Sequence, residues 1–239
     1  MKTRIVLAVL MLVGLAAYTQ AAMVTYSAND DFSIVNGNPN GMWAYGWGAD
    51  AADAYASVKN GTKLFTRYAN WETDGRTTGT LEGATIDAWS AADRDDPGIQ
   101  HNVGDAAYSN FGFTWGVNDL GLDSYGFSTP VTTVVQWTAP SAGTAVLDVT
   151  FGATNTTISE GLNGITGKIV ARDGSSSTHW SDTFAVNAGD TIAFGSGVNG
   201  SITMVQAAIN FTPVPEPASL VLLGVGITGI MAYAWRKRK

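Results

Sequence analysis

The sequence has 239 residues, no cysteine and a formal net charge of −7. Its two terminal segments hold six of the 13 Lys and Arg residues but only one of the 20 acidic residues, so residues 23–212 carry a formal charge of −12. Nucleic acid and anionic lipid are therefore not expected as partners, because both attract basic surfaces. No disulfide framework can support the fold, and about 190 residues can bury a substantial core without one.

Residues 1–22 have the layout of a secretory signal peptide. Lys2 and Arg4 precede an apolar stretch at residues 5–17, and the small residues Ala21 and Ala22 offer a cleavage site. We expect the Sec export machinery to translocate the chain and residues 1–22 to be removed. Residues 23–212 are then predicted to form one domain.

An aromatic strand is predicted to follow a tight turn near the start of this domain. Asn-Pro-Asn-Gly at residues 38–41 is typical of a turn, since proline fixes φ and glycine accepts positive φ. Trp43, Tyr45 and Trp47 then alternate, so they are expected to share one face of the strand. Flat rings on one face can stack on sugar rings, which makes these three residues the candidate glycan-binding site. The alternative is that this face belongs to the core.

The middle of the domain offers little that indicates catalysis. Residues 49–56 favour a helical turn or two. The other tryptophans, Trp71, Trp89, Trp115 and Trp180, lie in turn-rich contexts, where an exposed ring is more plausible than at Trp43 and Trp47. His101 and His179 are the only histidines and lack the spacing of a zinc site. No catalytic residue and no cofactor is predicted. Asp93, Asp95 and Asp96 are either a solvated loop or ligands of a structural calcium ion.

The second half of the domain alternates strongly between apolar and polar residues. Residues 133–137 and 145–151 are predicted to form strands. Val135 and Trp137 face inward in the first strand, and Ala145, Leu147, Val149 and Phe151 share the inward face of the second. Residues 165–171 and 205–211 repeat the pattern, and turn signals at 140–143, 172–175 and 187–190 separate the strands. The predicted fold class is all-β, with two packed antiparallel sheets in a jelly-roll or related sandwich.

The C-terminal tail has three parts. The first is Val214, Pro215, Glu216 and Pro217, whose prolines keep the chain extended. The second is an uncharged apolar run at residues 218–235, which as a helix rises roughly 27 Å, close to a hydrocarbon core of about 30 Å. Its predicted anchor residues are Ala218, Leu220, Leu222, Leu223, Ile227, Ile230 and Trp235. The third is a stop-transfer cluster of Arg236, Lys237, Arg238 and Lys239, which favours the cytoplasmic side.

This tail, residues 213–239, resembles the PEP-CTERM sorting signal of bacterial exported proteins, which is also grouped under an ice-binding protein C-terminal label. The resemblance implies an exosortase as partner and cleavage near Pro215, Glu216 and Pro217. A plain single-span anchor is the alternative. Before processing, the chain is expected to cross the inner membrane once with residues 23–212 outside the cytoplasm, and afterwards to reach the cell envelope or the extracellular space.

The body carries a second resemblance. Four motifs follow one another along the body. They are Asp-Phe-Ser at residues 31–33, the turn at 38–41 with Trp43 and Tyr45, Trp-Thr-Ala-Pro at 137–140, and Ala-Gly-Asp-Thr-Ile at 188–192. They resemble an exported domain that recurs in PEP-CTERM proteins of planctomycete-like bacteria. This resemblance implies a jelly-roll similar to galactose-binding-like and carbohydrate-binding modules, and it carries no agreed activity.

These observations predict an exported, non-enzymatic β-sandwich of the cell envelope or extracellular matrix that binds extracellular polysaccharide. One alternative is a polysaccharide hydrolase or lyase, which needs two carboxylates placed across a bond. The sequence does not reveal such a pair, although Glu72, Glu82 and Glu160 are the only glutamates of the body. The other alternative is a purely structural biofilm or matrix component.

Overall fold

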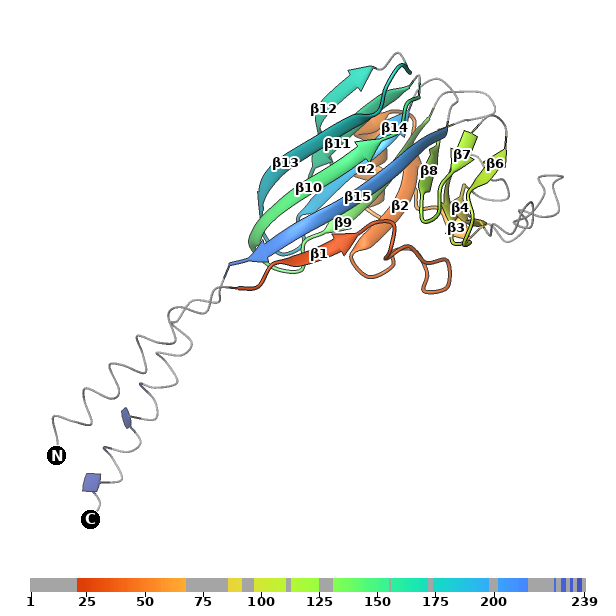
Figure 1. The fold of residues 1–239 in the computed structure, drawn as a ribbon. Helices are drawn as coiled ribbons and strands as arrows, with labels where there is room; N and C mark the ends of the chain where they lie inside the picture. Colours follow the sequence, from red (N-terminus) through yellow and green to blue (C-terminus); the bar gives the residue numbers. More distant parts are fainter. Residues whose placement is uncertain are drawn as a thin grey trace. The chain divides into compact units, whose positions relative to one another are not determined.

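The computed structural model describes residues 21–67, 86–91, 97–110, 113–124, 131–154, 156–171, 174–197 and 202–214, and six separate positions between 226 and 237. The chain divides into two compact units. One is Val24–Phe211, and the other consists of Met1–Met23 and Thr212–Lys239. The first unit is called the body below (Figure 1).

Most of the terminal unit lies outside the described residues. This applies to residues 1–20 of the predicted signal peptide, to Pro215, Glu216 and Pro217, and to most of the predicted span at 218–235. The six separate positions, all helical, are Gly226, Gly229, Ile230, Tyr233, Arg236 and Lys237. Within the described part of the chain, no helix has both the length and the apolar character needed to span a membrane.

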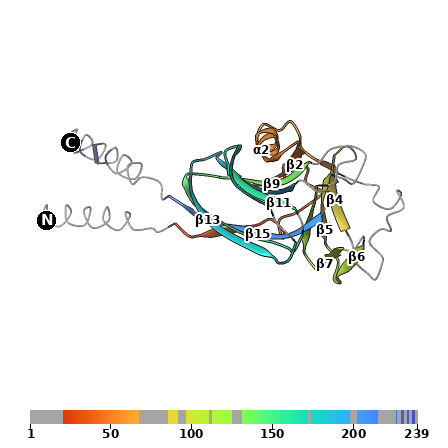
Figure 2. The same cartoon turned by 90° about the horizontal axis from the view of Figure 1, so that it is seen from above.

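The body is built on two antiparallel sheets (Figures 1 and 2). The larger sheet has the strand order β13-β10-β15-β8-β5-β4-β3, and β1 also pairs with β15. Its strands are β1 (Val24–Ser27), β3 (Thr66–Arg67), β4 (Ile86–Ser90), β5 (Gly98–Asn102), β8 (Leu120–Asp123), β10 (Gly143–Phe151), β13 (Thr178–Val186) and β15 (Ile202–Pro213).

The smaller sheet has the order β12-β11-β14-β9-β2. Its strands are β2 (Trp43–Gly48), β9 (Thr132–Thr138), β11 (Thr157–Leu162), β12 (Ile165–Ala171) and β14 (Thr191–Gly197). A separate two-stranded sheet is formed by β6 (Tyr108–Asn110) and β7 (Phe113–Trp115). The predicted all-β antiparallel sandwich is therefore confirmed.

The main core is rich in aromatic side chains. Trp137 on β9 lies 5.6 Å, centroid to centroid, from both Tyr26 on β1 and Phe211 on β15. Phe151 on β10 makes an edge contact with Phe194 on β14 at 6.3 Å. Each of these contacts joins a strand of the larger sheet to one of the smaller sheet, so the core fills the space between the two sheets.

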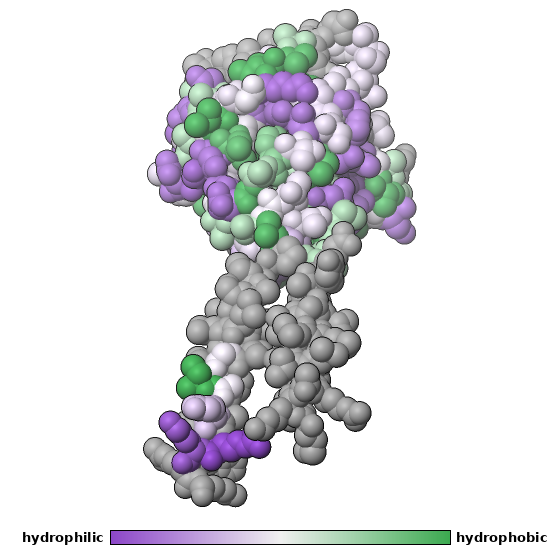
Figure 3. Space-filling view, turned by 90° about the vertical axis from the view of Figure 1, so that its left-hand side faces the viewer, coloured by the Kyte–Doolittle hydropathy of each residue, from purple (hydrophilic) through white to green (hydrophobic). Residues whose placement is uncertain are grey.

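The strands of the second half follow the sequence prediction closely. On β10, Ala145, Leu147, Val149 and Phe151 are fully buried, while the residues between them are partly exposed. Residues 205–211 lie within β15, and residues 133–137 within β9. Residues 165–171 form β12, but as the edge strand of its sheet it leaves Ile165 and Ile169 exposed. Hydrophilic and hydrophobic side chains are interspersed on the face of the molecule seen in Figure 3.

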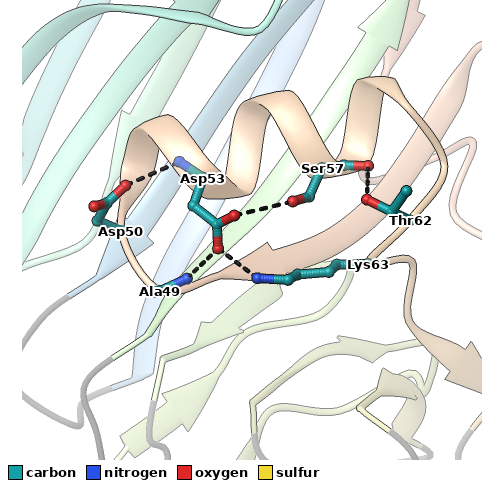
Figure 4. A network of polar contacts seen from close by, with 6 residues as sticks. All are labelled: Ala49, Asp50, Asp53, Ser57, Thr62 and Lys63. Atoms are coloured by element: carbon teal, nitrogen blue, oxygen red, sulfur yellow. Dashed lines mark hydrogen bonds and ion pairs between the residues drawn. The ribbon is translucent and has the colours of Figure 1, made fainter.

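The weak helical signal at residues 49–56 corresponds to a true helix, α2 (Ala51–Lys59), which is longer than predicted. Asp50 is its N-cap and accepts a hydrogen bond from the backbone nitrogen of Asp53 at 2.9 Å. The Asp53 carboxylate in turn accepts from the backbone nitrogen of Ala49, from the Ser57 hydroxyl and from the Lys63 ammonium (Figure 4). The hydrogen bonds from Lys63 and Ala49 lower the pKa of Asp53.

Helix α2 packs on the outer side of the smaller sheet (Figure 2). Tyr55 and Val58 of the helix form a second buried cluster with Ala44 of β2 and Val134 of β9. The approach is close: a Cβ at Gly48 would lie 2.3 Å from the backbone nitrogen of Ala54. Glycine is therefore required on this face of β2.

Candidate functional site

The structure places two of the three predicted glycan-binding residues in the core. Trp43 is 1% exposed and Tyr45 is completely buried. Alternation along β2 was predicted correctly, because its large side chains face inward while Ala44, Gly46 and Gly48 face α2. The inner face is covered by the opposing sheet and not by solvent, so Trp43 and Tyr45 cannot present a ring face to a ligand. The prediction of an exposed aromatic platform is therefore wrong for these two residues.

Trp47 is only partly buried, but its ring is not open either. It packs against the main core, and the Lys63 ammonium lies 5.2 Å from the ring centroid. A cation over an aromatic face occupies the surface on which a sugar would stack. Trp89, Trp115 and Trp180 are also buried, so none of them provides the exposed ring that their turn-rich segments left open. Trp71 lies outside the described residues.

A surface pocket of about 360 Å³ lies beside this buried aromatic strand. We call it the Asp31 pocket. It is lined by Tyr26, Asp31, Asn40, Gly41, Met42 and Trp43. Trp43 thus contributes to a candidate site after all, as part of a pocket wall rather than as a stacking platform.

The first wall of the Asp31 pocket comes from β1 and the turn that follows it. β1 pairs with β15 so that Tyr26 lies opposite Ile209, and the Tyr26 ring packs on Trp137. The backbone nitrogen of Asp31 donates to the carbonyl of Ser27 at 2.9 Å, which closes the turn. Because of this turn, the Asp31 side chain reaches Trp43, whose indole nitrogen donates to Asp31 Oδ2 at 3.1 Å.

The second wall is the predicted turn at residues 38–41. Asn40 and Trp43 exchange backbone hydrogen bonds of 2.8 and 2.9 Å, and Gly41 takes a φ of 56° between them. The Asn40 side-chain amide donates to the Asp31 carbonyl at 2.8 Å and so ties the two walls together. The Asn38 side chain fixes the base of the turn by bonding both the N–H and the carbonyl of Tyr45.

The Asp31 pocket brings several kinds of chemical group together. The Tyr26 ring, the Asp31 carboxylate and the Asn40 amide group lie next to the apolar side chain of Met42. Behind the pocket, in the core, the buried hydroxyl of Tyr45 has no hydrogen-bond partner among the described residues, and burial together with the charge of Asp31 raises the pKa of Tyr45 well above its usual range. Sequence reasoning singled out Trp43 but not Tyr26 or Asp31, since only the pairing of β1 with β15 brings them to β2.

A second pocket, of about 300 Å³, lies on the other side of the same turn. Its lining residues are Ser27, Asn29, Asp30, Asn118, Asp148, Thr150, Gln206, Ala207 and Ala208. Asp30 accepts a hydrogen bond from Asn118 Nδ2 at 2.7 Å, and Asp148 pairs with the exposed His179 at 2.9 Å. This pocket has no aromatic wall, so it lacks a surface on which a sugar ring can stack. The Asp31 pocket is therefore the better candidate for a saccharide.

One pair of carboxyl groups lies close enough to interact electrostatically. Glu160 on β11 is 7% exposed, and the carboxylate of Asp182 on β13 acts on it through its charge. Lys168 lies 3.4 Å from Asp182 and 4.4 Å above the Trp180 ring. Burial and the charge of Asp182 raise the pKa of Glu160 to about 7. The Oε2 atom of Glu160 has no hydrogen-bond partner among the described residues.

The histidines and acidic residues form no metal site among the described residues, where no group of three or more is placed to hold an ion. His101 is buried, bonds the Asn118 side chain at 2.8 Å, and has a pKa lowered by burial. The candidate calcium ligands Asp93, Asp95 and Asp96 lie outside the described residues.

Residues 213–239 match the family described as the PEP-CTERM protein-sorting motif. The predicted sorting signal is therefore confirmed. The protein is an exported protein that carries an exosortase sorting signal. No curated protein matches the chain.

Several solved structures are similar to part of the body. The C-terminal CBM6 of the laminarinase LamC from Zobellia galactanivorans is 15% identical, with a TM-score of 0.27, over 44% of this chain and 86% of that chain. A family 35 carbohydrate-binding module from Clostridium thermocellum is 14% identical, with a TM-score of 0.26, over 38% and 91%. The K3 adhesin domain of Lys-gingipain from Porphyromonas gingivalis is 13% identical, with a TM-score of 0.28, over 47% and 84%. Scores this low carry no argument, and the sandwich assignment rests on the strand pairing described above.

Proposed function

We propose that the protein is a component of the cell envelope or extracellular matrix that binds extracellular polysaccharide in the Asp31 pocket. The observation that carries this proposal is the composition of the pocket wall, where the Tyr26 ring lies beside the Asp31 carboxylate and the Asn40 amide group. Aromatic rings contact the apolar faces of sugars, and planar polar groups exchange hydrogen bonds with their hydroxyls. The pocket is formed by strands and a hydrogen-bonded turn, which hold these groups in place before any ligand arrives.

The proposed role is binding rather than catalysis. Glu160 and Asp182, the one pair of neighbouring carboxyl groups described above, do not line the Asp31 pocket, so the pocket itself holds no such pair. A matrix component without a specific ligand is the rival proposal. The two differ in whether the protein is retained by any polysaccharide.

Replacing Gly41 by Asn is expected to weaken polysaccharide binding by about tenfold or more. A Cβ at Gly41 meets no atom within 4 Å, and asparagine tolerates the positive φ of this position. The new side chain therefore leaves the fold intact while it narrows the pocket. Affinity electrophoresis of the full chain in detergent, through gels containing different bacterial polysaccharides, measures the effect.

Gly61→Asn is the matched control, since Gly61 also has a positive φ and an open Cβ position but lies after α2. It is expected to migrate like the unmodified protein. Equal retention of the Gly41 and Gly61 variants would place the binding site elsewhere. If no polysaccharide retains even the unmodified protein, the matrix proposal replaces this one.

We also propose that an exosortase removes the tail. The matched sorting motif supports this, and it is expected to act after Sec export and a single crossing of the inner membrane. Protein recovered from the envelope of cells with a working exosortase should lack the residues beyond about Pro217. Intact-mass analysis tests this directly. Recovery of chains that still end in Lys239 would indicate a permanent anchor instead.

A further inference from the structure

The carboxylate of the Asp31 pocket has no cationic partner in the described part of the chain. Its Oδ2 accepts from the Trp43 indole, and none of the described residues donates to Oδ1. The three lysines of the body are engaged elsewhere: Lys59 bonds the Asn163 carbonyl, Lys63 pairs with Asp53, and Lys168 pairs with Asp182. Among the side chains that the structure describes, one oxygen of this carboxylate therefore remains available to a ligand.

The charges around the Asp31 pocket favour one kind of polar ligand group over another. Asp30 places a second carboxylate on the other side of the turn, where it bonds Asn118, and residues 23–212 carry a formal charge of −12. An anionic sugar such as a uronate meets unfavourable charge at this turn. A protonated amine gains a charge-assisted hydrogen bond with Asp31, which is stronger than the bond from a neutral hydroxyl.

We propose that the polysaccharide bound in the Asp31 pocket contains sugars with free amino groups, and that Asp31 selects them. This inference rests on the proposed polysaccharide-binding function and names its ligand class. Tyr26 contacts the sugar ring, and Asp31 accepts a hydrogen bond from the ammonium group.

The test compares two polymers that differ only in acetylation, glycol chitin and glycol chitosan, in affinity electrophoresis of the full chain. In mildly acidic buffer the amines of glycol chitosan are protonated. The unmodified protein is expected to be retained about tenfold more strongly by glycol chitosan. Asp31→Asn should abolish this preference while it keeps a hydrogen-bonding group next to Trp43.

Asp30→Asn is the control, because it removes the same charge from the adjacent residue but faces the other pocket. It is expected to keep the preference. Equal losses in both variants would show that the polymer responds only to the overall negative charge, and the inference would fail. Equal retention on both polymers, or stronger retention on a uronate polymer such as alginate, would also overturn it while leaving the proposed function standing. Absence of retention on every polymer would reject the proposed function itself.

Discussion

Replacing Trp43 by Ala is expected to reduce the free energy of unfolding by about 3–5 kcal/mol, the usual range for truncating a buried aromatic side chain. The ring is 1% exposed within the main core, and β2 pairs it with the fully buried Trp137 of β9. Truncation also removes the indole that donates to Asp31. For a domain of this size, the melting temperature should fall by roughly 10 °C, which differential scanning calorimetry can measure.

Trp47→Ala is the comparison within the same strand. Trp47 is partly exposed and its ring lies under Lys63, so less of its contact area is lost on truncation. We expect this variant to lose less than half as much stability as the Trp43 variant. Similar melting temperatures for both variants would contradict the difference in burial between the two rings.

Replacing Glu160 by Gln is expected to stabilise the protein above pH 7 and to leave it nearly unchanged at low pH. Burial first, and then the Asp182 carboxylate, raise the pKa of Glu160 from 4.5 to about 7, while Lys168 partly offsets this effect. The folded state therefore keeps a proton that the unfolded state releases, and stability falls as the pH rises from 4.5 through 7. The loss amounts to at most about 3 kcal/mol, because one pH unit corresponds to about 1.4 kcal/mol.

Urea unfolding between pH 4.5 and 8 measures this effect. The unmodified protein should lose stability over the interval, and the Glu160→Gln curve should be flatter. Besides Asp182 and Lys168, Tyr55 on α2 also interacts with the charge of Glu160, and it stays protonated because burial raises its pKa. Asp148→Asn is a suitable control, since Asp148 is half exposed and pairs with His179 at the surface. If the Glu160 and Asp148 variants showed the same pH dependence, Glu160 would not be the responsible group.

The strands of the second half were predictable from the sequence because one physical rule governs them. Residues on β10 and β15 alternate between the core and the outer surface, and apolar side chains mark the inner positions. On β9, Val135 and Trp137 also face the main core, while Val134 faces α2 on the other side of the strand. The turns at 38–41 and 187–190 were predictable for a similar local reason, since glycine or proline fixes the backbone there. The sorting signal is likewise local, because its three parts follow one another along the chain.

The candidate site was only partly predictable. Alternation correctly placed Trp43 and Tyr45 on one face of β2, but it cannot tell whether a face is covered by solvent or by another sheet. The alternation of large and small residues in β2 was a usable signal: its small residues admit α2, which leaves the large ones on the core side. The electrostatic interaction between Glu160 and Asp182 could not be predicted from the sequence for the same reason, since the two residues lie on strands of different sheets.

The sequence by itself thus determined the class of fold, the positions of most strands in the second half and the C-terminal sorting signal, because each depends on residues that are neighbours along the chain. Only the tertiary structure decided which aromatic face is core and which residues line the pocket. Tyr26 and Asp31 meet Trp43 because β1 pairs with β15, about 180 residues later in the chain, and the two sheets pack face to face. Contacts across such a separation depend on which strands pair, and local patterns of polarity do not determine strand pairing.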